Sequence, residues 1–348
     1  MTVEAWKLRG PVAPAVRQGL FAAIPVGAGV LLDIELDLPA SGALATGALL
    51  AGFVAFDAPP RTRAVWQLLT APVIGLGAAL GALTGDVAWL AVITMTVFAS
   101  IAGVTVVVSP RLGIAGMTCA LALVIAQGVA IRPDQAPLAL LLGGAGAAIQ
   151  TLMSLTASIG APPEARVHPI AGARAALRTI RDNLTLRSKG FRHALRWGTA
   201  LGFGVALYHV LGLGEHGYWI PLTTLFVLKP EAGLTWERIA MRAAGTVLGL
   251  VIATPLAMAI GSFPVVEAVA IAIAAGFAFA LLPIEYALFT TSITSFVILL
   301  SHSLGQSAWQ AADQRGIGTA LGILVAAGAF VLWSNHPLEK VEGDMAEV

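Results

Sequence analysis

Two arginines stand one helical turn apart at the start of an apolar run. Arg238 and Arg242 lead into a stretch that stays apolar to about residue 260. A cationic side chain inside a bilayer costs about 2.5–3.5 kcal/mol on insertion scales, so it usually has a function. Arg242, the deeper of the two, could hold a carboxylate through two parallel hydrogen bonds. Alternatively, Arg238 snorkels to the headgroups, and Arg242 pairs with an acidic residue: Asp57, Glu231 or Glu237.

The apolar segment before these arginines is too short to cross a bilayer. It has 11 residues, from Tyr218 to Leu228, and ends at Lys229-Pro230. A helix of that length reaches about 17 Å, against a hydrocarbon core of about 30 Å. A helix end inside the membrane must be covered by protein or face water, and its free N–H groups attract anions. The side chains that we expect at this break are Trp219, Pro221, Thr223 and Thr224. The alternative is a tilted interfacial helix with an aromatic belt.

Further candidates lie elsewhere in the chain. Arg315, followed by several glycines, could line the outer mouth of an anion pathway through the membrane. A local pair with Asp313 is its structural alternative. Proton coupling would require a titratable group, and the candidates for it are Glu285, Asp57, His302 and His216. The alternative for each histidine is an ordinary structural position at a helix end.

The composition identifies an integral membrane protein. The 348 residues are 57% hydrophobic and 11% charged, whereas soluble domains carry about 25% charged residues. A net charge of +1 gives no reason to expect a nucleic-acid partner. The sequence contains no phosphate-binding loop, paired-histidine zinc motif or nucleophile elbow. We therefore expect that the protein is not an enzyme and that it binds no metal or cofactor. Any uphill transport must then be driven by an ion gradient.

The apolar runs predict an all-α integral membrane protein of about twelve transmembrane helices in two similarly oriented six-helix repeats. Shifts of about 170 and 175 residues superpose Gly75 on Gly245 and Arg17 on Arg192. The predicted spans are 15–32, 42–56, 64–83, 87–108, 112–130, 136–157, 192–212, 218–228, 239–260, 264–282, 286–302 and 315–333. The predicted domains are an N-terminal repeat (1–160), a basic connector (161–191), a C-terminal repeat (192–335) and a tail (336–348).

The basic connector determines the predicted orientation. Its arginines and lysine far outnumber its acidic residues. The positive-inside rule therefore places the connector in the cytoplasm, and with six spans on either side, both termini as well. Residues 171–186 have apolar and basic side chains at helical spacing, which predicts an amphipathic helix on anionic lipid headgroups. The alternative is a docking site for a cytoplasmic partner.

Residues 216–249 resemble the membrane module of the fusaric acid resistance (FUSC) proteins, which are grouped with the aromatic acid exporters and, more remotely, with the plant aluminium-activated malate transporters. The residues that carry the resemblance are Tyr218-Trp219, Pro221-Leu222-Thr223, Lys229-Pro230, Arg238, Arg242, Gly245-Thr246, Gly249, Arg315, Thr319 and Gly322. The resemblance implies a multi-pass protein of the bacterial inner membrane. It also implies proton-driven export of small, often aromatic, carboxylates and assembly as a homodimer.

One departure from that family concerns the middle of the chain. Many relatives have a large soluble domain between their membrane halves, and here the short connector stands in its place. The functions of that domain are therefore not carried over to this chain. Two other functions stay open beside the exporter: a passive organic-anion channel, and a non-transporting membrane scaffold whose connector recruits a partner.

Overall fold

The computed structural model describes residues 12–36, 42–129, 131–159, 169–214, 217–228 and 232–332. In these ranges every regular element is a helix, in agreement with the predicted all-α class. Nine of the described helical segments are long and apolar enough to cross a membrane. The chain is therefore a multi-pass helical membrane protein.

The first candidate membrane span before the connector is broken into two helices, α1 and α2. The helices before the connector are α1 (Val12–Ala22), α2 (Ile24–Leu36), α3 (Ala43–Phe53), α4 (Pro60–Thr84), α5 (Ala88–Val104), α6 (Pro110–Gly128) and α7 (Ala136–Thr156). Short 3₁₀ turns, η2 (Thr105–Val107) and η3 (Pro133–Gln135), lie on either side of α6. Prolines occupy the first turn of α4, α6 and α7, where the missing N–H leaves no hydrogen bond unmade.

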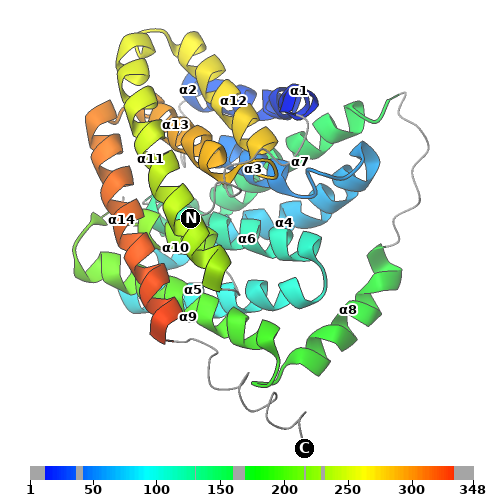
Figure 1. Cartoon of the computed structure of the whole chain (residues 1–348). Helices are drawn as coiled ribbons and strands as arrows, with labels where there is room; N and C mark the ends of the chain where they lie inside the picture. Colours follow the sequence, from blue (N-terminus) through cyan, green and yellow to red (C-terminus); the bar gives the residue numbers. More distant parts are fainter. Residues whose placement is uncertain are drawn as a thin grey trace, which may run out of the picture.

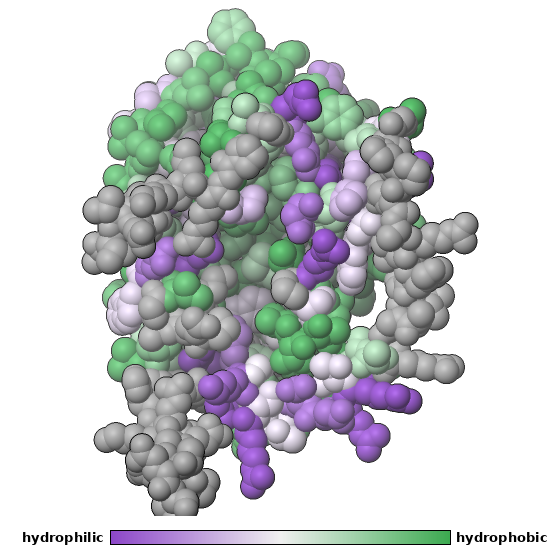
Figure 2. Space-filling model, turned by 45° about the vertical axis from the view of Figure 1, so that its right-hand side comes forward, coloured by the Kyte–Doolittle hydropathy of each residue, from purple (hydrophilic) through white to green (hydrophobic). Residues whose placement is uncertain are grey.

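The remaining helices are α8 (Pro169–Asn183), α9 (Lys189–Val210), α10 (Trp219–Val227), α11 (Ala232–Ile260), α12 (Pro264–Leu281), α13 (Tyr286–Ser303) and α14 (Ala308–Leu332). Helix α8 occupies the stretch for which the sequence predicts an amphipathic helix. It lies apart from the other helices, with Leu177 and Leu184 exposed beside Arg178 and Arg181 (Figure 1). Figure 2 shows hydrophilic residues gathered along the lower edge of the molecule, the edge on which Figure 1 places α8.

The two short helices, α3 and α10, lie in the interior. Helix α10 has nine residues, all of them buried, and nine of the eleven residues of α3 are buried. Helix α3 packs against α7, and α10 packs against α14. Protein therefore covers both of these short helices, as backbone that ends at membrane depth requires.

Helices from the two ends of the chain pack across each other. Helix α1 lies along α12, and α9 lies along α5 (Figure 1). Glycines make both contacts close: Gly19 faces the backbone carbonyl of Gly276, and Gly198 faces the side chain of Ser100. Small residues allow helices to approach closely in lipid, where the hydrophobic effect does not drive them together.

Candidate functional site

Arg242 and Arg315 are the largest fully buried side chains in the described part of the protein. Arg242 comes from α11 and Arg315 from α14, and each has an exposed fraction of 0%. Arg315 lies about two turns after the start of α14, and Arg242 lies about three turns after the start of α11. The two helices run in opposite directions (Figure 1). The two helices thus bring both cations to the interior.

Neither arginine has a hydrogen-bond partner among the described residues. This holds for Nε, Nη1 and Nη2 of Arg242 and for Nε and Nη1 of Arg315. The Tyr286 hydroxyl interacts favourably with Arg242 but does not meet hydrogen-bond geometry with it. Asp57, a predicted partner of Arg242, instead lies 3.8 Å from Arg111. Arg242 and Arg315 thus form no ion pair with a described residue, and Glu231, another predicted partner of Arg242, lies outside the described residues.

Aromatic rings of α10 lie against both guanidinium groups. Cζ of Arg315 is 4.2 Å from the centre of the Trp219 ring, and Cζ of Arg242 is 5.5 Å from the centre of the Phe226 ring. A ring face attracts a cation, and more strongly where water is excluded. Arg238 is different. It is half-buried, and its Cζ lies 4.0 Å from the ring of Tyr286, at the start of α13.

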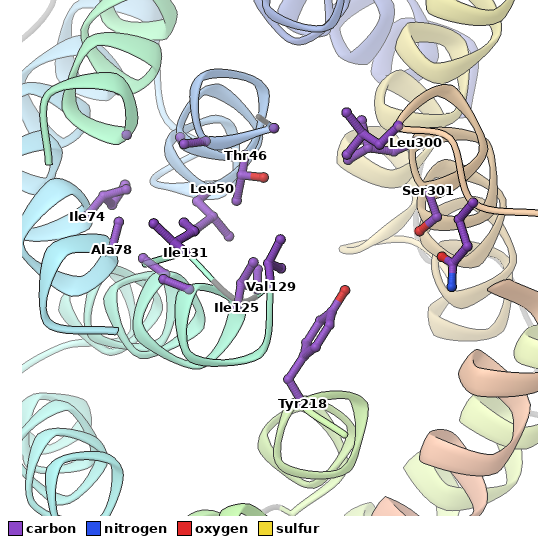
Figure 3. A pocket seen from close by; sticks show the side chains of 18 of the residues that line it. Thr46, Leu50, Ile74, Ala78, Ile125, Val129, Ile131, Tyr218, Leu300 and Ser301 are labelled. Atoms are coloured by element: carbon purple, nitrogen blue, oxygen red, sulfur yellow. The ribbon is translucent and has the colours of Figure 1, made fainter. Parts of the chain in front are cut away.

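The two buried arginines line a small chamber of about 90 Å³. A larger chamber of about 460 Å³ adjoins it, because six residues line both: Thr46, Leu50, Ile125, Tyr218, Leu300 and Ser301. Figure 3 shows the Tyr218 side chain pointing into the space between Ile125 and Ser301. Gly128 packs against the Tyr218 ring, and any larger residue there would collide with it. Tyr218 is therefore held at the boundary between the two chambers.

The larger chamber is mostly apolar on one side and polar on the other. Helices α3, α4 and α6, with the residue that follows α6, supply apolar side chains, among them Leu50, Ile74 and Val129 (Figure 3). Ser301 of α13 supplies a hydroxyl group, and Gln306 after α13 and Gln310 of α14 supply amide groups. The chamber lies at the end of the bundle away from α8, since α9 starts beside α8 and Tyr218 follows the far end of α9.

The other predicted residues of α10 fix the helix in place. The Thr224 hydroxyl donates to the carbonyls of Ile220 (3.0 Å) and Gly322 (3.1 Å), which joins α10 to α14. Pro221 packs against Gly204 of α9. Thr223 is buried, and its hydroxyl has no partner among the described residues. Of the four residues predicted at the break, only Trp219 lines a chamber.

The described proton-coupling candidates lie outside both chambers. Glu285 caps α13, and its carboxylate accepts a hydrogen bond of 2.6 Å from the Leu288 N–H. Asp57 is 66% exposed beside Arg111. Nδ1 of His302 lies 2.7 Å from the carboxylate of Glu267, which is buried on α12. His216 lies outside the described residues.

Replacing Glu285 by glutamine should lower the free energy of unfolding by about 1 kcal/mol, because the charged cap of α13 is lost. Thermal unfolding of the variant beside the unmodified protein would measure this effect. An unchanged Tm would show that the cap does not stabilise α13.

Three contributors to these chambers were not predicted as site residues. Tyr218 enters the sequence analysis as the first residue of the short apolar segment and as a residue that carries the family resemblance, Phe226 only as part of an apolar run, and the apolar wall from α3, α4 and α6 not at all. An aromatic or aliphatic residue in a membrane protein carries no signal that separates a chamber wall from a packing contact. The signal for these residues appears only when the helices are assembled.

The second half of the chain is similar to known proteins. Residues 200–331 match the profile described as "Fusaric acid resistance protein-like". The chain is 35% identical over 154 residues to "Inner membrane protein YccS" of Escherichia coli (strain K12), a match that covers 44% of the chain and 21% of that protein. It is also 42% identical over 73 residues to "Uncharacterized protein ORF2" of Neisseria gonorrhoeae, which covers 21% of the chain and 17% of that protein.

The chain thus spans about a fifth of the length of the E. coli relative. No solved structure matches it significantly. The profile match covers all or part of α9 to α14, and so includes the short helix, both buried arginines and the glycines that face α10. Residues 200–331 of this chain are thus similar to the fusaric acid resistance protein-like family, and part of the chain is similar to a bacterial inner-membrane protein.

Proposed function

We propose that the protein is a secondary transporter that exports small organic anions, aromatic carboxylates among them. The observation that carries the proposal is the pair of buried arginines without partners at the wall of the chambers. A buried charge is costly unless something compensates it, and a bound carboxylate would do so with charge-assisted hydrogen bonds. The apolar wall of the larger chamber suits the ring of an aromatic acid.

We further propose that the membrane part consists of two six-segment repeats, with α1 and α2 counted as one segment. Corresponding contacts support this reading. In each half a short helix packs on the last helix through a glycine: Gly146 faces the backbone of α3, and Gly322 faces the backbone of α10. The first segment of each half also packs on the fourth segment of the other half. Two such halves could rock about the anion between them.

An aromatic cluster supports the proposal that a gate on the connector side of the small chamber is closed. Phe53 lies at the end of α3, with its ring centre 4.8 Å from that of Phe279 and 5.9 Å from that of Phe289. Phe226 and Tyr286 lie 5.7 Å and 5.5 Å from Phe289. Phe53 and Phe226 also line the small chamber, so the cluster separates the arginines from the connector side. A connector in the cytoplasm would then make this an outward-facing state.

Replacing Phe289 by alanine should open a leak through this cluster, because Phe289 contacts three of the other rings and is fully buried. We expect passive efflux of a loaded anion to rise about tenfold or more, and Tm to fall as a large buried side chain is lost. Flux from preloaded proteoliposomes would measure it. Phe263→Ala, at an exposed position between α11 and α12, is the control. Equal leak rates for both variants would exclude the gate.

Proton coupling, in this proposal, uses His302 and Glu267. Protonation of the imidazole would create an ion pair between α12 and α13, and the neighbouring Leu300 and Ser301 line both chambers. His302→Gln should therefore weaken the response of flux to a pH gradient and leave anion binding intact. The measurement is flux at matched anion gradients, with and without a pH difference. An unchanged response would remove His302 from the coupling mechanism.

The overall proposal is tested by flux into proteoliposomes of a panel of aromatic and aliphatic acids. A transporter should concentrate an anion when a pH gradient is imposed, and should saturate with concentration. Conductance that persists without any proton gradient would favour the passive channel. Absence of flux for every acid, together with a protein that copurifies through the connector, would favour the scaffold.

A further inference from the structure

The two arginines share one small chamber, and the protein supplies no acidic side chain to it. The described residues that line this chamber include no aspartate or glutamate. Both side chains have an exposed fraction of 0%, and the two guanidinium groups repel each other. We propose that the headgroup bound here carries two negative charges. This inference rests on the proposed function and narrows its substrate class.

Charge balance favours a doubly charged headgroup. A buried ion costs several kcal/mol when it is not compensated, even after the protein relaxes. A singly charged carboxylate would leave one positive charge uncompensated beside Arg242 and Arg315. A doubly charged headgroup leaves none. The ring faces of Trp219 and Phe226 attract the cations, but they provide no acceptor for the N–H groups at the guanidinium edges.

The number of hydrogen-bond donors in the small chamber also favours two negative charges. Arg242 and the two unpartnered nitrogens of Arg315 together present about eight N–H bonds without a described acceptor. A single carboxylate offers about four lone-pair positions. Two neighbouring carboxylates, or one phosphonate with three oxygens, would satisfy more of these donors. Both the donors and the charges of the chamber therefore exceed what one carboxylate can match.

The sizes of the two chambers favour a compact headgroup on a larger body. The small chamber, at about 90 Å³, has room for a headgroup but not for a whole aromatic acid. The adjoining chamber, at about 460 Å³, has room for a ring and its substituents. Three of the six residues that line both chambers are aliphatic: Leu50, Ile125 and Leu300. The ligand class is thus an aromatic or aliphatic body with a compact doubly charged end.

Phenylphosphonate and benzenesulfonate test the inference, because they share a ring and a tetrahedral headgroup and differ in charge. At about pH 8.5 the phosphonate carries close to two charges, since the second ionisation of a phosphoryl group lies near pH 6, whereas the sulfonate carries one. Isothermal titration of the detergent-solubilised full chain should show that phenylphosphonate binds at least about tenfold more tightly than benzenesulfonate. The same ratio is expected between phthalate and benzoate.

Arg315→Gln should reduce both ratios to about threefold or less, because only one cation then remains. Arg178→Gln, at an exposed position of α8, is the matched control and should leave both ratios unchanged. Ratios near one in the unmodified protein, with binding still lost on Arg242→Gln, would overturn the two-charge inference and leave the proposed function standing. Failure of all four probes to bind would count against both.

Discussion

Replacing Arg242 by glutamine should abolish anion transport and, at the same time, make the empty protein more stable. Glutamine cannot supply the charge-assisted hydrogen bonds of a guanidinium, so we expect flux to fall by about 100-fold or more. The substitution also removes a buried cation that has no partner among the described residues. Such a charge costs about 2.5–3.5 kcal/mol in a membrane helix, so a gain of about 1–3 kcal/mol is reasonable.

Flux and thermal unfolding of the solubilised protein without added anion would measure the two effects. Phthalate should raise Tm in the unmodified protein but not in the variant, because only a form that binds the ligand is stabilised by it. Arg111→Gln serves as the control, since that side chain is partly exposed beside Asp57. A variant that transports normally would remove Arg242 from the site. A variant that is inactive and strongly destabilised would indicate a structural ion pair.

Replacing Gly322 by alanine should have the second largest effect. A Cβ there would lie 2.6 Å from the Ile220 carbonyl oxygen and 2.6 Å from the Thr223 Cβ, so α10 would have to move away from α14. The hydrogen bond from Thr224 to the Gly322 carbonyl would be strained as well. We expect a loss of about 1–3 kcal/mol in stability and a large loss of flux, because α10 holds Trp219 against Arg315.

The same helix provides the matched control for this substitution. Gly328 has open space around its Cα, so alanine at 328 meets no atom within 4 Å. Gly328→Ala should therefore leave flux unchanged, and helix propensity would leave stability equal or slightly higher. The readouts are Tm and flux for the two variants side by side. Similar behaviour of both would contradict a tight contact between α10 and α14.

The positions of the helices could be predicted closely where apolar residues reach the helix end. The predicted span 218–228 corresponds to α10 (Trp219–Val227), and 264–282 corresponds to α12 (Pro264–Leu281). The predicted starts at 64, 239 and 315 are late, because charged residues open α4, α11 and α14. Hydropathy measures the cost of transfer into lipid, whereas a helix continues wherever its backbone hydrogen bonds persist.

The site could be predicted only in part. Residue type indicates the free-energy cost of placing a side chain in the membrane, but not the direction in which that side chain points. Arg242 and Arg315 stood out since a charge inside a membrane needs a reason. His302 was chosen by its chemistry, yet it lies on the face of α13 toward α12, while the adjacent Ser301 lines the chambers. Which face of a helix meets a cavity depends on its neighbours, and one sequence does not contain that information.

We expect a bound organic anion to place its charge at Arg242 and Arg315 and its body in the larger chamber. A crystal structure of the protein with 4-bromophthalate tests this placement most directly, because bromine is located by its anomalous scattering. We expect carboxylate oxygens within hydrogen-bond distance of the two guanidinium groups, and bromine in the larger chamber near Ile74 or Val129. Bromine found only outside both chambers, with the arginines empty, would contradict it.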